Sequence, residues 1–286
     1  MAADPALNSP PSAPLIQLTD ISKRYNVGLP NEAEVLHGVA LTLARGEFVA
    51  LIGPSGSGKS TLLNIIGLLE RPSAGSYRIE GQETTGLEDA ALTQRRSTAL
   101  GFVFQFHHLL PAFTALENVT LPALMREGRV RAEQRIRAEE VLAAMGLAQA
   151  MEKRPGQLSG GMQQRVAIAR ALAFKPPLLL MDEPFGALDE ITRERLNDEL
   201  LKIWARTKTT IIFVTHSISE AVFLSSRIVV MSARPGRITK LINIDLPYPR
   251  DIATRENRRF FELATEVREA LRAGEASRAG ESEKLH

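Results

Sequence analysis

The chain has 286 residues, with 35 Lys and Arg against 33 Asp and Glu, and it contains no cysteine. This length allows one large domain or two small ones, and 44% apolar with 24% charged residues is typical of a chain that buries a core. The formal charge of +2 demands neither a nucleic acid nor an acidic partner. The lack of cysteine excludes a disulfide scaffold, a thiolate metal site and a cysteine nucleophile.

No apolar run approaches the roughly 20 residues that a membrane-spanning helix needs. The first residues, MAADPALNSPPSAP, contain an early aspartate and repeated prolines, which is unlike a secretory signal peptide. We therefore expect residues 1–14 to be disordered and the protein to reside in the cytosol.

The apolar pattern predicts secondary structure in chain order. Residues 105–175 are predicted to be mainly helical, because Ile136, Val141, Leu142 and Met145 recur at helical spacing between charged residues. Strands are predicted at 15–21, 35–43, 48–52, 76–79, 102–104, 178–181, 210–214, 228–231 and 238–244. Further helices are predicted at 61–69, 192–207, 219–224 and 256–272. Strands that alternate with helices indicate an α/β fold with a largely parallel sheet.

A glycine-rich motif, Gly53–Thr61, follows the predicted strand 48–52 and opens a helix. Its pattern is G-x-x-x-x-G-K-[ST], whose backbone N–H groups converge on phosphate oxygens at a helix N-terminus. Lys59 can reach the β- and γ-phosphates, and the Ser60 hydroxyl can bind Mg²⁺. A glycine-rich turn with an incidental lysine is the alternative, but the strand and the helix on either side argue against it.

Two further motifs accompany this loop. The strand 178–181 ends in Asp182 and Glu183, which suits a carboxylate near the metal and another that polarises the attacking water. Taken alone, the pair is also consistent with helix capping. In the segment 158–165, Ser159 caps a helix opened by two glycines, so its first-turn amides can receive an anion.

Together these motifs resemble those of ATP-binding-cassette (ABC) transporter ATPases, over roughly residues 15–245. The resemblance implies a P-loop domain with an N-terminal antiparallel β subdomain, a mainly parallel sheet flanked by helices, and an inserted helical subdomain at about 106–173. Residues 246–286 would form a C-terminal helix and a disordered tail. Residues 158–162 resemble the family signature and are called the signature segment; Met162 stands there where the family more often has glutamine.

The resemblance implies ATP and Mg²⁺ as cofactors and gives roles to the matching residues. The residues that match catalytic positions are Glu183, His216, Lys59 and Gln105. Those that match metal-binding positions are Ser60, Gln105 and Asp182. Those that match nucleotide-binding positions are Tyr25, Gly53, Pro54, Ser55, Gly56, Ser57, Gly58, Lys59, Ser60, Thr61, Asp182, Ser159, Gly160 and Gly161.

Several of these residues have plainer interpretations when they are considered alone. Tyr25, which matches the aromatic residue that stacks on adenine, also suits packing beside a strand end. Gln105 alone would be a surface glutamine, and His216 alone a core histidine. The adjacent pair His107 and His108 does not predict a metal site, because neighbouring helical residues do not face one ion and no third ligand is near.

The resemblance also implies partners. The chain has one P-loop and one signature segment, and in the family the signature of one subunit closes over the ATP of another, so a homodimer is expected. The loop 187–189 matches the one that crosses this dimer. Transmembrane permease subunits would place the protein at the cytoplasmic face of the inner membrane, and an extracytoplasmic solute-binding protein would deliver the solute. The permease contact would lie at 102–121 and the helices after it, although part of this segment also suits the core of the helical subdomain.

Two subfamily resemblances conflict. The segment 101–119 resembles ATPases of lipoprotein release and related export, whereas 185–193, 231–238 and 246–251 resemble importers of nitrate, taurine and alkanesulfonates. The longer C-terminal resemblance favours import of a small anionic solute, with lipoprotein or lipid export as the alternative. A non-transport ABC ATPase acting on DNA or ribosomes lacks support, since the chain has no mid-chain coiled coil, no second cassette and no strong positive charge.

Overall fold

The computed structural model describes residues 13–282, so the predicted disordered N-terminus lies almost entirely outside the described residues. The N-terminal sheet is antiparallel, in the order β2-β1-β4-β5. Its strands are β1 (Ile16–Tyr25), β2 (Ala33–Leu43), β4 (Ala74–Ile79) and β5 (Gln82–Glu83). The predicted antiparallel β subdomain is present.

A second sheet has six strands in the order β10-β9-β3-β8-β7-β6. All neighbouring pairs are parallel except β9 with β10. The strands are β3 (Phe48–Ile52), β6 (Leu100–Phe104), β7 (Leu178–Asp182), β8 (Thr210–Val214), β9 (Arg227–Met231) and β10 (Ile238–Asn243). This is the expected mainly parallel core.

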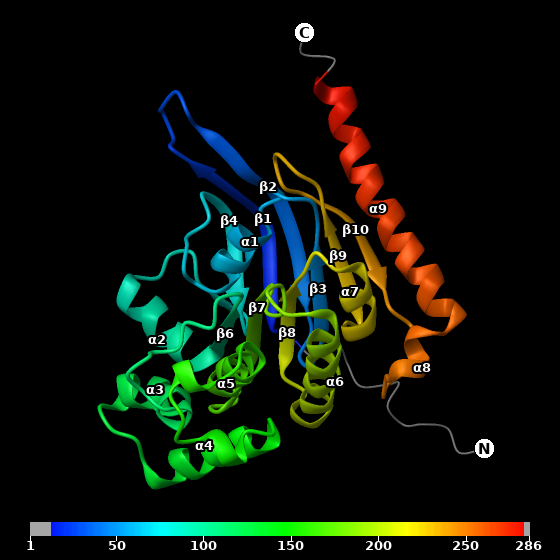
Figure 1. The fold of residues 1–286 in the computed structure, drawn as a ribbon. Helices are drawn as coiled ribbons and strands as arrows, with labels where there is room; N and C mark the ends of the chain where they lie inside the picture. Colours follow the sequence, from blue (N-terminus) through cyan, green and yellow to red (C-terminus); the bar gives the residue numbers. More distant parts are fainter. Residues whose placement is uncertain (1–12, 283–286) are drawn as a thin grey trace, which may run out of the picture.

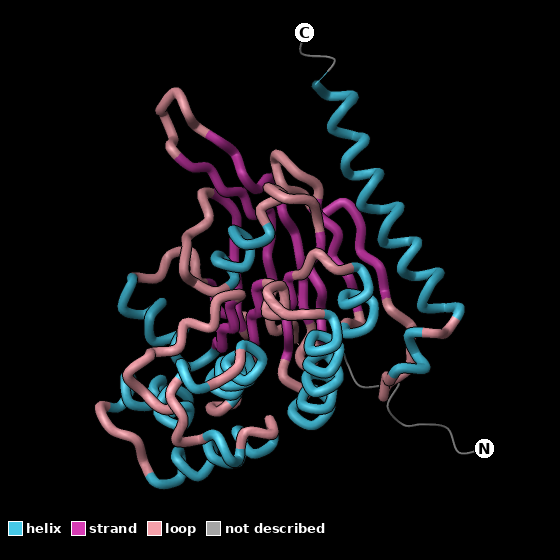
Figure 2. The backbone as a smooth tube through the Cα atoms, in the orientation of Figure 1, coloured by secondary structure: helices cyan, strands magenta, loops and turns pink. Residues whose placement is uncertain are grey.

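Helices surround the six-stranded sheet, and α3, α4 and α5 gather at one end of the molecule (Figures 1 and 2). The helices are α1 (Lys59–Ile66), α2 (Asp89–Ala99), α3 (Ala115–Glu127), α4 (Ala132–Ala144), α5 (Gly160–Leu172), α6 (Glu190–Thr207), α7 (Ile218–Leu224), α8 (Ile252–Arg255) and α9 (Arg258–Ser282). Short 3₁₀ helices lie at Ala148–Ala150 and Pro155–Gln157. None of the helices within residues 13–282 is both long and apolar enough to span a bilayer.

Two hydrophobic clusters hold the sheets and helices together, and strand alternation divides residues between them. On β3, Phe48, Ala50 and Ile52 belong to the cluster that includes residues of α5, α6 and α7, whereas Val49 and Leu51 belong to the cluster with α1 and the antiparallel sheet. Successive side chains of a strand point to opposite faces, so a strand buried on both faces is apolar throughout. The carboxyl ends of β3, β7 and β8 are thereby fixed at one edge of the sheet.

The structure differs from the sequence-based expectations at several places, and α8 and β5 are among the elements that were not predicted. Helix α2 had no counterpart in the predicted elements, and α9 continues beyond residue 272, where the C-terminal helix was expected to end. Ile136, counted in the apolar pattern of the helical segment, is 56% exposed, whereas Val141, Leu142 and Met145 are buried. The buried face of α4 is therefore narrower than the pattern indicated.

Candidate functional site

The glycine-rich loop joins β3 to α1 and folds over its own lysine. Gly56 and Gly58 have φ of +76° and +79°, and a Cβ on Gly58 would lie 2.6 Å from a Leu36 methyl carbon. Both positions therefore require glycine. The Lys59 ammonium is buried and donates hydrogen bonds to the carbonyl oxygens of Gly53 at 2.8 Å and Pro54 at 3.0 Å. Burial lowers the pKa of Lys59, while Glu183 and Asp182 nearby act in the opposite direction.

Asp182 is the last residue of β7 and lies beside the start of α1. Its carboxylate accepts a hydrogen bond from the Ser60 side chain. Burial raises the pKa of Asp182, and the neighbouring Glu183 charge raises it further, against the lowering effects of Ser60, Lys59 and His216. A hydroxyl and a carboxylate held together form a hard oxygen donor set of the kind Mg²⁺ prefers.

Glu183 has an unusual backbone conformation, with φ of +46°. Its N–H donates to the Val214 carbonyl at 3.0 Å, which ties the residue to the end of β8. Its Oε1 lies 2.5 Å from Nε2 of His216, just beyond the same strand. A non-glycine residue in this region is strained, and such strain clusters at functional sites. The surrounding structure thus holds one carboxylate and one imidazole in a fixed relation.

Gln105, directly after β6, faces the same pair of residues. Together with Glu183 and His216 it lines a cavity of about 330 Å³. A Cβ on Gly186 would lie 3.4 Å from Gln105 Nε2, so the amide lies close to the turn after Glu183. The structure therefore brings three of the four predicted catalytic residues into one cavity, with the fourth, Lys59, in the adjoining one.

That larger cavity has a volume of about 770 Å³ and is centred on the loop 55–61. Glu183 and His216 form one side of it, and Ala33, Glu34 and Val35 of β2 contribute to another. Tyr25 is absent from this lining. Its hydroxyl instead donates to Glu70 at 2.5 Å, and Thr61 lies within hydrogen-bonding reach of it. Burial, with the Glu70 contact, raises the pKa of Tyr25.

The loop between β9 and β10 contributes residues that the sequence analysis did not single out for the site. Arg234 and Pro235 line the 770 Å³ cavity, and the Arg234 guanidinium approaches within about 3.6 Å of where a Cβ on Gly56 would be. A Cβ on Gly236 would lie 2.1 Å from the Ser57 carbonyl oxygen, so this loop packs directly on the glycine-rich loop. The Pro-Gly turn was visible in the sequence, but nothing in it indicated this contact.

The signature segment lies elsewhere on the surface. The Ser159 hydroxyl accepts a hydrogen bond from the Met162 N–H at 3.3 Å and caps α5. Ser159, Gly160 and Gly161 line a cavity of about 350 Å³ together with Asp189, which caps α6. Among the described residues, none lines both this cavity and the one at the glycine-rich loop. One chain therefore holds the glycine-rich loop and the signature glycines in two separate cavities.

Comparison with known proteins places this geometry in context. Residues 36–186 match the family described as ABC transporter. A lipoprotein-releasing system ATP-binding protein of Rhodopseudomonas palustris is 51% identical over 205 residues, 72% of this chain and 91% of the relative. A bicarbonate transport ATP-binding protein of Synechococcus elongatus is 45% identical over 250 residues, 85% of each chain.

Solved structures agree with these relatives. A dimeric ATP-binding cassette in a post-hydrolysis state, bound to ADP and phosphate, superimposes with a TM-score of 0.72 at 41% identity. The match covers 81% of this chain and 100% of the other. The same architecture therefore occurs in a protein that holds the products of ATP hydrolysis in a dimer.

Proposed function

This chain belongs to the ABC transporter family as an ATP-hydrolysing subunit. From this premise we propose that two copies of the chain enclose two ATP-Mg²⁺. The dimer then drives the import of a solute through separate permease subunits. The observation that carries the dimer is the separation of the two cavities on one chain, each of which forms one half-site. A second copy, facing the first, brings its Ser159-Gly160-Gly161 edge to the nucleotide held by the glycine-rich loop.

The residues have distinct tasks in this proposal. The backbone N–H groups of the loop 53–58 and the Lys59 ammonium bind the β- and γ-phosphates. Ser60 and Asp182 would supply oxygen ligands to Mg²⁺, with Gln105 at the same edge, and the ion would offset phosphate charge. Glu183 accepts a proton from the attacking water, and His216 fixes the position of its carboxylate.

A cross-linking experiment tests the composite site. Since the chain has no cysteine, Ser55→Cys and Gly160→Cys introduce two unique thiols, one in each half-site. Gly160 tolerates a side chain, because a Cβ there meets only Leu188, at 3.8 Å. In a Glu183→Gln background, a short bismaleimide should join two chains when ATP and Mg²⁺ are present.

The control pairs Ser55→Cys with Arg129→Cys, because Arg129 is exposed and lines neither half-site. This pair should give no ATP-dependent covalent dimer. A cross-link between the two introduced thiols of a single chain would contradict the shared site. So would a covalent dimer that forms equally well with and without ATP.

Of the two candidate transport functions, import of a small anion is favoured. The match to the bicarbonate transport relative spans 250 residues, against 205 for the lipoprotein-release relative, and so takes in more of this chain. The C-terminal segment is also part of the fold, because buried Arg250 donates hydrogen bonds to the carbonyl oxygens of Val222, Phe223 and Ser225 at 2.9–3.1 Å. Lipoprotein release stays the second candidate, supported by the higher identity of 51%.

The membrane partner is proposed to contact exposed apolar side chains of the segment after β6 and of α3. Phe106 is 71% exposed and Met125 78% exposed, although both are large and apolar. Purification of the chain with its membrane partner separates the two directions. Uptake of bicarbonate, nitrate or taurine into vesicles, dependent on ATP and a solute-binding protein, supports import; release of a lipoprotein from the membrane without uptake supports the alternative.

A further inference from the structure

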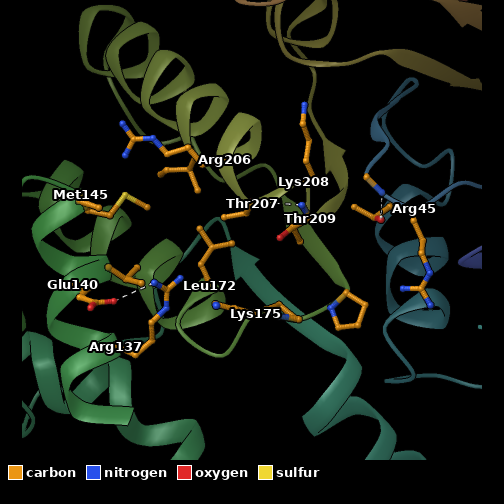
Figure 3. A pocket seen from close by; sticks show the side chains of 17 residues that line it. Arg45, Arg137, Glu140, Met145, Leu172, Lys175, Arg206, Thr207, Lys208 and Thr209 are labelled. Carbon is orange, nitrogen blue, oxygen red and sulfur yellow. Dashed lines mark hydrogen bonds and ion pairs between the residues drawn. The ribbon is translucent and has the colours of Figure 1, made fainter. Parts of the chain in front are cut away.

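A second cavity, remote from the nucleotide site, lies at the amino-terminal ends of β7 and β8. Its volume is about 570 Å³, and it is lined by residues of α4, the end of α6 and the segment before β7 (Figure 3). Asp182 and His216 lie at the opposite ends of these two strands. Cavities that take a small ligand commonly have about 300–1,000 Å³, so this one has a suitable size.

The cavity has a surplus of positive charge. Glu140 is its one carboxylate within the described residues, and it pairs with Arg137 at 3.3 Å. The basic side chains that line it are Arg45, Arg137, Lys175, Arg206 and Lys208, of which Arg45 pairs with Glu80 outside the cavity lining. The carboxyl ends of α5 and α6 also lie here, with about half a negative charge each, which offsets only part of the surplus.

Two further observations indicate what the cavity accepts. Val141, Met145, Leu172 and Ile203 give it an apolar wall. Figure 3 shows Arg137 and Lys175 extending toward the middle of the cavity from opposite walls. Cationic groups over an apolar wall suit a ligand with an acidic group on an apolar body.

We propose that this cavity binds a small amphipathic organic anion, at a site separate from that of ATP. The ligand's apolar body lies against Val141 and Ile203, and its acidic group lies between Arg137 and Lys175. It thereby contacts both α4 of the helical insertion and α6 of the core. Helix α5, which begins at the signature glycines, and α6, which begins after Asp189, both end in this cavity, so a bound anion constrains elements that carry the signature half-site.

The probe for this site is 8-anilinonaphthalene-1-sulfonate, whose fluorescence rises in apolar surroundings. Saturating ADP and Mg²⁺ are present throughout to occupy the nucleotide site. The double variant Arg137→Gln/Lys175→Gln should weaken probe binding about tenfold, since it removes two partly exposed charge contacts. The matched control Arg129→Gln/Lys153→Gln removes two exposed charges of the helical insertion outside the cavity and should leave binding unchanged.

A second pair of variants tests the cavity without changing charge. Ala144 is exposed and lines the cavity, whereas its neighbour Ala143 is exposed and does not. Ala144→Phe should therefore abolish binding that Ala143→Phe retains, with thermal unfolding confirming that both fold. N-phenyl-1-naphthylamine, the uncharged analogue, should bind more weakly than the sulfonate. Equal binding of the two probes, or sulfonate binding that survives Ala144→Phe, would overturn the proposal.

Discussion

Nε2 of His216 lies 2.5 Å from Oε1 of Glu183, and the backbone N–H of Glu183 is held by the carbonyl of Val214 at the end of the strand that leads to His216. The ends of β7 and β8 are thus joined by both a main-chain and a side-chain contact. Since these strands are adjacent and parallel, their carboxyl ends meet at one edge of the sheet. That edge fixes the Glu183 carboxylate above the glycine-rich loop.

Replacement of this carboxylate should separate ATP binding from hydrolysis. Glu183→Gln keeps the size of the side chain but cannot accept a proton from water, so the hydrolysis rate should fall by about 10²–10⁴-fold. ATP affinity should persist, and a closed dimer should accumulate because the bridging γ-phosphate is retained. Light scattering after size exclusion with ATP and Mg²⁺ measures this. A variant that stays monomeric under these conditions would refute the ATP-bridged dimer.

Lys59→Ala should weaken nucleotide binding itself. A buried ammonium that donates to phosphate oxygens contributes roughly 1.5–3 kcal/mol, which corresponds to about 10–100-fold in affinity. Titration with a fluorescent ATP analogue checks this value. Lys153→Ala, at an exposed position of the helical insertion, is the control and should bind as the unmodified protein does. Unchanged ATP hydrolysis by Lys59→Ala would exclude the assigned site.

Much of the site could be predicted from local sequence because its chemistry is local. The strand predicted at 48–52 is β3 with the same bounds, and the motif from Gly53 to Thr61 lies where strand and helix spacing place it. The two carboxylates at the end of β7, Asp182 and Glu183, were predictable for the same reason. A buried strand that ends in charged residues presents them at the edge of the sheet.

Other features depend on contacts between distant parts of the chain. Arg234 reaches the glycine-rich loop only because β9 pairs with β3. The local sequence of either strand does not predict that pairing. Ile136 shares the helical period of its buried neighbours, yet its side chain is exposed because the face of α4 that packs against the protein does not extend to it. The separation of the signature glycines from Lys59 likewise follows from the placement of α5, which only the tertiary structure shows.

In the absence of nucleotide, the ionised side chain of Asp182 should lower the free energy of unfolding of the protein. Burial raises its pKa, so the folded protein binds this proton more tightly than the unfolded chain does, and the ionised form at neutral pH lowers the free energy of unfolding. Asp182→Asn should therefore unfold at a higher urea concentration at neutral pH, while it loses Mg²⁺-dependent hydrolysis.

This stability gain of Asp182→Asn should also shrink as pH falls toward the raised pKa, because the unmodified protein then becomes protonated at the same position. Urea titrations at pH 7.5 and at about pH 5, a value nearer the ordinary carboxyl range, give the comparison. A variant that is less stable than the unmodified protein at neutral pH would show that the interactions with Ser60, Lys59 and His216 outweigh burial.

Arg234 should strengthen nucleotide binding although it belongs to no phosphate-binding motif. Its guanidinium is exposed at the rim of the cavity, next to Gly56, and no carboxylate of residues 13–274 pairs with it. An exposed charge contact contributes about 0.2–1 kcal/mol, so Arg234→Gln should weaken ATP affinity by up to about fivefold, more at low salt than at high salt. Arg237→Gln, on the same loop but outside the cavity lining, removes the same charge and should leave ATP affinity unchanged. Equal losses in the two variants would mean that only the overall charge of the loop acts on the nucleotide, and that Arg234 makes no specific contact.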